Sequence, residues 1–276
     1  MKKIYAMTSA IVAILCLVLG VSGDGADMTV TVGSSGPQVD SVVVANADPT
    51  AGSTTQITIT TQITDTNGVE DIEEVTAGFT VGSPDNGNNI TTMNRGICTD
   101  VDGNTIQCIA TYNMQFYDPA QTYTIQVYAK DVGGASHTLT DNFAYSSLLA
   151  LELDADTIAF GSMSVSQTVE KVGDEDMGST GSATIKNQGN AIIDAQIYAT
   201  NFAGSTDSFG AGQAEAQFAA LGYSVLSNTP GRTETGLDLA IGSSSLENVD
   251  FKLTIPTGAL PEAYTSTITV NAVANS

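Results

Sequence analysis

The stretch Ser53–Gly68, STTQITITTQITDTNG, decides the fold. Ile57 and Ile59 alternate with threonines, and Ile63 follows after what we interpret as a one-residue slip. Alternation of period two is typical of a strand with one face buried and the other in water. The stretch ends in Asp-Thr-Asn-Gly, residue types that turn the chain. We therefore expect a protein built from antiparallel sheets.

Similar short runs recur along the whole chain. They predict strands at 39–45, 54–64, 75–81, 105–114, 122–129 and 137–145, and then at 149–153, 157–160, 182–186, 192–199, 249–255 and 263–272. Each group has enough strands for a sandwich. We predict an all-β chain with two tandem immunoglobulin-like antiparallel β-sandwich domains, at 38–147 and 148–276. Residues 211–221, rich in Ala, Gln and Glu, favour a short helix ended by Gly222.

The first residues predict export. Lys2 and Lys3 precede an apolar run at 10–19 and then small residues, the order of a signal peptide. As a helix the run would rise about 15 Å, well short of a bilayer core of roughly 30 Å. We predict a signal peptide at 1–23, with cleavage after Ala26 or an uncleaved short anchor as alternatives. Residues 24–37 would then form an extended strand at 27–32 and a Gly33–Gly36 linker.

The charge limits the class of partner. The formal net charge is −22, and loss of residues 1–23 leaves six basic against thirty acidic side chains, a charge of −24. Nucleic acid and anionic lipid are disfavoured because both require clustered Lys and Arg. We expect a protein or glycan partner at the cell surface, self-assembly included, and no stable membrane insertion once the signal peptide is cleaved.

Two cysteines remain after the signal peptide, Cys98 and Cys108. A hairpin loop centred on residues 102–104 would pair Val101 with Thr105 and place the two cysteines directly across the ladder. Export into an oxidising compartment favours a disulfide. Free thiols or soft metal ligands are the alternative, although no histidine lies near them in the sequence.

Two turns are rich in the oxygen ligands that calcium prefers. The candidate ligands are Asp65, Asn67, Glu70, Asp71, Asp100, Asp102 and Asn104. Neither turn completes a known calcium loop, because one lacks a bidentate acid at its far end and the other lacks regular spacing. Asp, Asn and Gly also form turns for backbone reasons alone, so calcium and plain turn chemistry stay open as alternatives.

No motif indicates catalysis. His137 is the only histidine, so no catalytic triad and no histidine-based metal site is available, and the chain has no Trp for a sugar platform. We expect no enzyme activity and no cofactor other than calcium. Asn89, followed by Ile and Thr, is a candidate glycosylation site.

Tyr123 and Tyr264 each open a Thr-rich extended run, where sandwich domains often place a tyrosine corner. The chain also resembles surface proteins of archaea and small-genome bacteria with tandem immunoglobulin-like domains. The matching pieces are the early strand Met28–Val32 with Pro37, the Ile63–Ile72 segment, the Cys98 and Cys108 pair, the Ile158–Gly161 segment, the Asn-Gln-Gly-Asn turn at Asn187–Asn190 and the closing run Ile255–Val270. The closing run at Ile255–Val270 departs from that pattern, since Glu262 and Ala263 replace the usual glycine. The resemblance implies an exported surface role and no chemistry.

The combined expectation is a non-enzymatic, extracellular or cell-surface structural or interaction protein. One alternative is a pilus-like filament subunit that donates strand 27–32 to a neighbouring copy. Another is a calcium-dependent adhesin that binds glycan or protein.

Overall fold

The computed structural model describes residues 29–30, 33, 35–84, 87–179, 181–219, 221–230 and 233–275. The predicted signal peptide lies outside these residues, and so does the predicted strand 27–32 apart from Thr29 and Val30. Both therefore stay predictions. Within the described part of the chain, no helix has the length and apolar character needed to cross a membrane.

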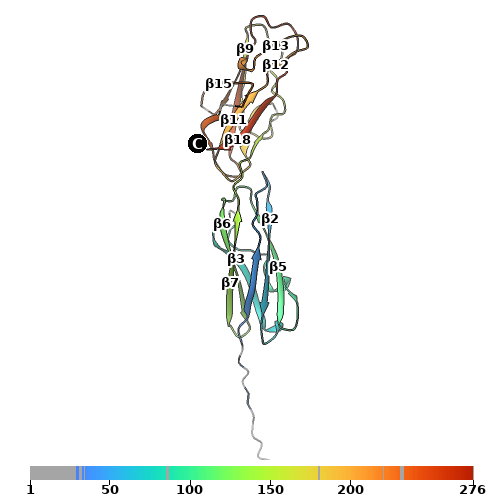
Figure 1. The fold of residues 1–276 in the computed structure, drawn as a ribbon, viewed down its shortest axis with the longest axis vertical. Coiled ribbons are helices and arrows are strands. Elements are labelled where there is room, and N and C mark those ends of the chain that lie inside the picture. The colour runs from blue at the N-terminus through green and yellow to red at the C-terminus, as the bar shows by residue number, and fades with distance from the viewer. Residues whose placement is uncertain are drawn as a thin grey trace, which may run out of the picture. The chain divides into compact units, whose positions relative to one another are not determined.

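The first sandwich consists of two antiparallel sheets (Figure 1). One sheet has the order β1 (Gln38–Val44), β2 (Thr55–Thr64), β5 (Thr105–Met114), β4 (Thr99–Asp100), and the other the order β3 (Ile72–Val81), β6 (Gln121–Asp131), β7 (Ser136–Tyr145). Two single 3-10 turns, η1 (Val69–Asp71) and η2 (Arg95–Ile97), lie between strands. This is the strand order of a seven-stranded immunoglobulin domain, so the predicted fold class is confirmed.

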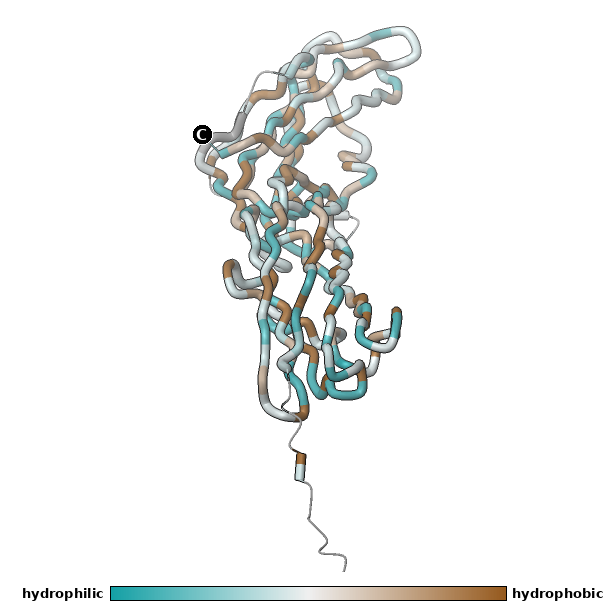
Figure 2. The backbone as a smooth tube through the Cα atoms, turned by 60° about the horizontal axis from the view of Figure 1, so that its bottom comes forward, coloured by the Kyte–Doolittle hydropathy of each residue, from teal (hydrophilic) through white to brown (hydrophobic). Residues whose placement is uncertain are grey.

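Strand β2 shows why the sequence folds this way. Ile57, Ile59, Thr61 and Ile63 are buried, and Thr58 and Gln62 between them are exposed. Figure 2 shows hydrophobic and hydrophilic residues alternating along the strands. The predicted slip is wrong, because Thr61 occupies the inward position that the alternation requires. The Thr61 hydroxyl donates a hydrogen bond of 2.7 Å to the carbonyl of Ser41, which removes the cost of burying it.

Strand β6 forms the centre of the first core. Tyr123, Ile125, Val127 and Ala129 point inward and are fully buried. The Tyr123 ring stacks on Phe143 at 5.4 Å between centroids. Its hydroxyl donates to the carbonyl four residues earlier, Pro119, at 2.9 Å. The predicted tyrosine corner is thus present at the start of β6.

The second sandwich has its own hydrophobic core. Its larger sheet has the order β15 (Ser224–Val225), β14 (Ala214–Phe218), β17 (Leu246–Thr254), β10 (Ala183–Asn187), β8 (Leu151–Leu153), and β9 (Thr168–Lys171) also pairs with β17. The smaller sheet has the order β16 (Thr233–Leu239), β11 (Ile193–Ala199), β18 (Ile268–Ala274). A short hairpin of β12 (Phe202–Ala203) and β13 (Ser208–Phe209) extends from it.

Three predictions for the second sandwich differ from the structure. The predicted strand at 263–272 begins only at Ile268, in β18. Residues 157–160 form no strand. Residues 211–221 form no α-helix: a 3-10 turn, η3 (Ala211–Gln213), leads into strand β14. Ala214, Ala216 and Phe218 are buried while the residues between them are partly exposed, so a period of two overrides the helix propensity of Ala and Glu. Pairing with β17 supplies the hydrogen bonds that a helix would otherwise provide.

The predicted disulfide is confirmed. Strand β4 pairs with β5 so that Thr99 lies opposite Gln107, which places Cys98 opposite Cys108 with their Cα atoms 4.1 Å apart. Cys108 is fully buried in the first core. The bond ties the short strand β4 to the sheet at its outer edge.

Tyr264 forms a second corner, before strand β18. Its hydroxyl lies 3.0 Å from the carbonyl of Leu260, again four residues earlier, and 3.0 Å from a carboxylate oxygen of Asp207. The second predicted tyrosine corner is therefore also present.

Glu262 explains the departure from the usual glycine. Its carboxylate accepts hydrogen bonds from the backbone N–H groups of Ser205, Thr206 and Asp207, at 3.0, 3.1 and 2.8 Å, and from the hydroxyl of Ser205. The hydrogen bond from the Ser205 hydroxyl, and then those from the N–H groups of Asp207 and Thr206, lower the pKa of Glu262. An acid at this position thus fixes the loop between β12 and β13.

We expect replacement of both Cys98 and Cys108 by alanine to lower the free energy of unfolding by about 2 to 3 kcal/mol, because the bond closes a short loop and restricts the unfolded chain. Urea unfolding curves of the double variant and the oxidised parent measure the loss. Equal midpoints would contradict it.

Glu262→Gln should remove a pH-dependent contribution to stability. Because the folded pKa lies below the ordinary value of 4.5, the contribution is complete above that pH and is lost as pH falls toward the folded pKa. Melting temperatures of parent and variant should therefore differ at about pH 6 and converge near about pH 3. The exposed Glu74→Gln serves as control, and a difference independent of pH would refute this account.

Candidate metal centre

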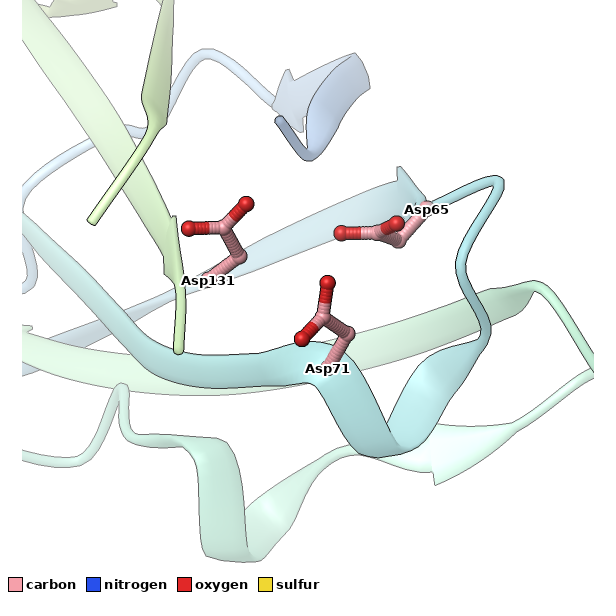
Figure 3. A group of neighbouring side chains, drawn as sticks. All are labelled: Asp65, Asp71 and Asp131. Atoms are coloured by element: carbon pink, nitrogen blue, oxygen red, sulfur yellow. The ribbon is translucent and has the colours of Figure 1, made fainter. Parts of the chain in front are cut away.

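Three aspartates from separate elements meet at one end of the first sandwich (Figure 3). Asp65 directly follows β2, Asp71 is the last residue of η1, and Asp131 is the last residue of β6. One carboxylate oxygen of each lies within 4.8 Å of the other two. The three side chains therefore form a compact cluster of oxygen ligands.

Local hydrogen bonds hold each aspartate in place. The Oδ1 atom of Asp65 accepts from the N–H of Asn67 at 2.8 Å, and Oδ1 of Asp131 accepts from the N–H of Ala135 at 2.7 Å. The N–H of Val132 donates to the carbonyl of Asp71 at 2.9 Å. The turns thus orient the carboxylates of Asp65 and Asp131, and a backbone hydrogen bond fixes the main chain at Asp71.

The cluster contains a buried carboxylate oxygen that makes no hydrogen bond within the protein. Asp65 and Asp131 are fully buried, and Oδ2 of Asp65 has no hydrogen-bond partner. Burial raises the pKa of Asp65, and the nearby charges of Asp71 and Asp131 raise it further against the opposing hydrogen bond from Asn67. A buried carboxylate oxygen without a hydrogen bond destabilises the fold unless the group is protonated or binds a cation.

The donor set fits a hard divalent cation. All three side chains offer oxygen, and a hard cation such as calcium or magnesium prefers oxygen ligands. Calcium accepts a larger and less regular shell than magnesium, which needs near-octahedral geometry. Three carboxylates from three separate turns therefore favour calcium, with water or backbone carbonyls completing the shell.

The predicted turn at 65–71 contributes two of its four candidate ligands to the cluster. Asp65 and Asp71 come together, but Asn67 and Glu70 are exposed and stand outside the cluster. The side-chain oxygen of Asn67 instead accepts a hydrogen bond from the N–H of Ser35 at 2.7 Å.

The predicted turn at 100–104 contacts the cluster through its backbone. Oδ1 of Asp102 accepts from the N–H groups of Asn104 and Thr105, each at 2.8 Å, which is ordinary turn geometry. Asp100 forms an ion pair of 3.7 Å with Arg95. The carbonyl of Asn104 accepts from the N–H of Asp65 at 2.8 Å. This hairpin thus fixes the backbone beside the aspartate cluster and contributes no carboxylate to it.

Asp131 was not among the predicted ligands. The sequence shows a turn at 131–134, but only the register of β3 and β6, in which Ile72 lies opposite Asp131, brings that turn beside Asp71. The sequence feature that marks Asp131 is therefore an acidic residue at the end of a strand. This feature identifies Asp131 as a candidate ligand only once the strand pairing is known.

The sequence also drew attention to His137 and Asn89, and the structure shows the contacts of both. His137 lies on β7, and its Nδ1 accepts from the N–H of Val39 at 3.1 Å while its Nε2 lies 3.4 Å from Nε2 of Gln38. The imidazole therefore secures the start of β1. Asn89 is exposed and bridges to Gly78, and its glycosylation stays a prediction.

No protein-family model and no curated protein matches the chain. Among solved structures, it is similar to the complex of the chaperone CsuC with the tip adhesion subunit CsuE from Csu pili of Acinetobacter baumannii, with 10% identity over 84% of this chain and 100% of the other, and a TM-score of 0.35. A chaperone and tip adhesin complex of CFA/I fimbriae biogenesis aligns with 8% identity over 84% and 80%, with a TM-score of 0.29. The C-terminal domain of the antigen I/II-family protein AspA from Streptococcus pyogenes aligns with 11% identity over 84% and 92%, with a TM-score of 0.23. These scores are too low to support any function, so the proposals below rest on this chain's own residues.

Asp65→Asn should stabilise the metal-free protein at neutral pH by about 1 to 2 kcal/mol, because it removes the charge on the unpartnered buried oxygen and keeps the acceptor used by Asn67. The raised pKa means that the penalty exists above that pKa and disappears as the wild-type carboxylate takes up a proton. Chelator-treated samples melted at about pH 7 and about pH 4 should show the gain at the higher pH alone. A loss of stability in the variant at neutral pH would contradict the assignment.

Proposed function

We propose that this chain is a non-enzymatic structural or interaction protein of the cell surface, whose first sandwich is stiffened by a bound calcium ion. The observation that carries the proposal is the buried, unpartnered Oδ2 of Asp65 facing Asp71 and Asp131. A cation there links the end of β2, the turn η1 and the end of β6, three segments distant in the sequence. Such a link stabilises a domain without any reaction.

The disulfide supports an extracellular location. Cys98 and Cys108 are bonded, and such bonds persist in oxidising compartments. The acidic surface supports the same location, because a large negative charge keeps an exported domain soluble and attracts divalent cations.

The surroundings of His137 support a non-enzymatic role. This is the chain's only histidine, the side chain that most often serves as a general base near neutral pH. Its ring instead contacts the backbone of Val39 and the side chain of Gln38. The imidazole thus has a structural task in joining β1 to β7.

Calcium binding should raise the melting temperature of the first sandwich. At an excess of about a hundredfold over Kd the gain is about 2.7 kcal/mol, which corresponds to a shift on the order of 10 °C for a domain of this size. Differential scanning calorimetry with calcium, magnesium or chelator measures the shift, and isothermal titration measures the stoichiometry.

Variants of the cluster locate the site. Asp131→Asn should abolish most of the calcium shift, because it removes one of three ligands. Glu70→Gln lies in the same region, removes the same charge and stands outside the cluster, so it should keep the shift. Loss of the shift in both variants, or in neither, would refute the assigned site. Protease accessibility of the protein on intact cells tests the location separately.

A further inference from the structure

The smaller sheet of the second sandwich has an unpaired edge. In the first sandwich the corresponding sheet runs β3, β6, β7, and β6 pairs on both sides. In the second sandwich β18 pairs with β11 along its whole length, but no strand among the described residues pairs with its other side. The row of backbone groups along that side of β18 is therefore available to another strand.

Strand β18 is the counterpart of β6. Tyr123 lies near the start of β6, and Tyr264 lies just before β18. Each hydroxyl lies about 3 Å from the carbonyl four residues earlier, Pro119 for Tyr123 and Leu260 for Tyr264. Each of the two strands also pairs with the strand that comes first along the chain in its own sheet: β6 pairs with β3, and β18 pairs with β11. Among the described residues, no strand occupies the position beside β18 that β7 occupies beside β6.

The unpaired edge leaves apolar side chains partly in water. The inward residues of β6 are fully buried. Their counterparts Ile268, Val270 and Ala272 pack against the second core but remain partly exposed. Leu151 and Leu153 of β8, which approaches β18, are partly exposed as well. An added strand would remove this apolar surface from water, which is the main source of stability in a sandwich.

The chain carries a segment suited to this edge. Residues 27–32 read Asp-Met-Thr-Val-Thr-Val, with Met28, Val30 and Val32 at every second position. This spacing matches the two-residue spacing of Ile268, Val270 and Ala272. Val30 is 86% exposed, more than any other large apolar residue described.

Charge permits the pairing despite the acidity of the chain. Strand β18 reads Ile-Thr-Val-Asn-Ala-Val-Ala and has no charged residue, and residues 28–32 have none either. Two strongly acidic copies can therefore meet here without placing like charges on opposing strands. Gly33, Ser34, Ser35 and Gly36, which connect the segment to the first sandwich, have the Gly- and Ser-rich composition of a linker.

We infer that residues 27–32 of one copy add as a strand to the free edge of β18 in a second copy. Donor and acceptor are different surfaces of the same chain, so each added copy presents a new acceptor edge and a new donor strand. A heterologous contact of this kind produces an open, linear assembly unless the rotation between copies closes a ring. This inference goes beyond the calcium proposal and does not depend on it.

The first test compares assembly of the secreted full chain and its Val30→Asp variant. Light scattering after size exclusion and negative-stain microscopy should show wild-type oligomers that grow with concentration. Val30→Asp places a charge on the apolar face of the donor and should raise the concentration needed for assembly by about tenfold or more. Val172→Asp, at an equally apolar residue that is 59% exposed outside both surfaces, should assemble like the wild type.

A synthetic peptide of residues 26–33 supplies the direct probe. The labelled peptide should bind the Val30→Asp protein, whose acceptor edge is intact, and an excess should dissolve wild-type oligomers. Wild-type monomers at all concentrations together with no peptide binding would overturn the inference. Unchanged assembly of Val30→Asp would also overturn it.

Mixed cysteine variants identify the pairing. Thr29→Cys and Asn271→Cys both place a thiol on an exposed position of the outward face. Mass spectrometry of the mixed, oxidised sample should find a peptide linking residue 29 to residue 271 across two chains. If the linked peptide appears only within single chains of a double variant, the segment folds onto its own molecule and the inference is wrong. Calcium removal leaves this result unchanged, so its failure is separable from failure of the metal centre.

Discussion

The structure depends on one constraint: the apolar face of every strand must be covered by a second sheet, and the edge of every sheet must be paired or protected. The first sandwich satisfies it almost completely, since the inward residues of β6 lie between β3 and β7 and beneath the opposite sheet. The second sandwich satisfies it only in part, since Ile268, Val270 and Ala272 stay partly exposed. The stability of the first sandwich and the association proposed for the second thus have the same physical basis.

Acidity acts differently at the surface and in the interior. On the surface, negative charge keeps the chain soluble and disfavours anionic partners. At the end of the first sandwich, Asp65 and Asp131 are buried close to Asp71, where repulsion is not screened by water. A cation there would turn a destabilising cluster into a link between three turns. In the second sandwich the carboxylate of Glu262 instead accepts hydrogen bonds from three backbone N–H groups.

Much of the first sandwich could be predicted because its strands alternate clearly and end in strong turn signals. The pairing of Cys98 with Cys108 followed from counting outward from one hairpin. Strand β14 could not be predicted in this way, because Ala and Glu favour a helix and only the neighbouring strand β17 imposes an extended conformation. Thr61 likewise interrupts the apolar alternation in the sequence. Only the tertiary structure shows that its buried hydroxyl donates a hydrogen bond to the carbonyl of Ser41.

The sequence by itself determined the class of fold, the disulfide, both tyrosine corners and two of the three clustered aspartates, because each of these depends on neighbours close in the chain or on a periodic pattern. Tertiary structure alone decided that Asp131 joins Asp65 and Asp71, and that the 100–104 hairpin supports the cluster from behind. It also decided that β18 pairs on one side only among the strands that the structure describes. These features depend on which distant strands pair and in what register, and a periodic pattern specifies the face of a strand without specifying its neighbour.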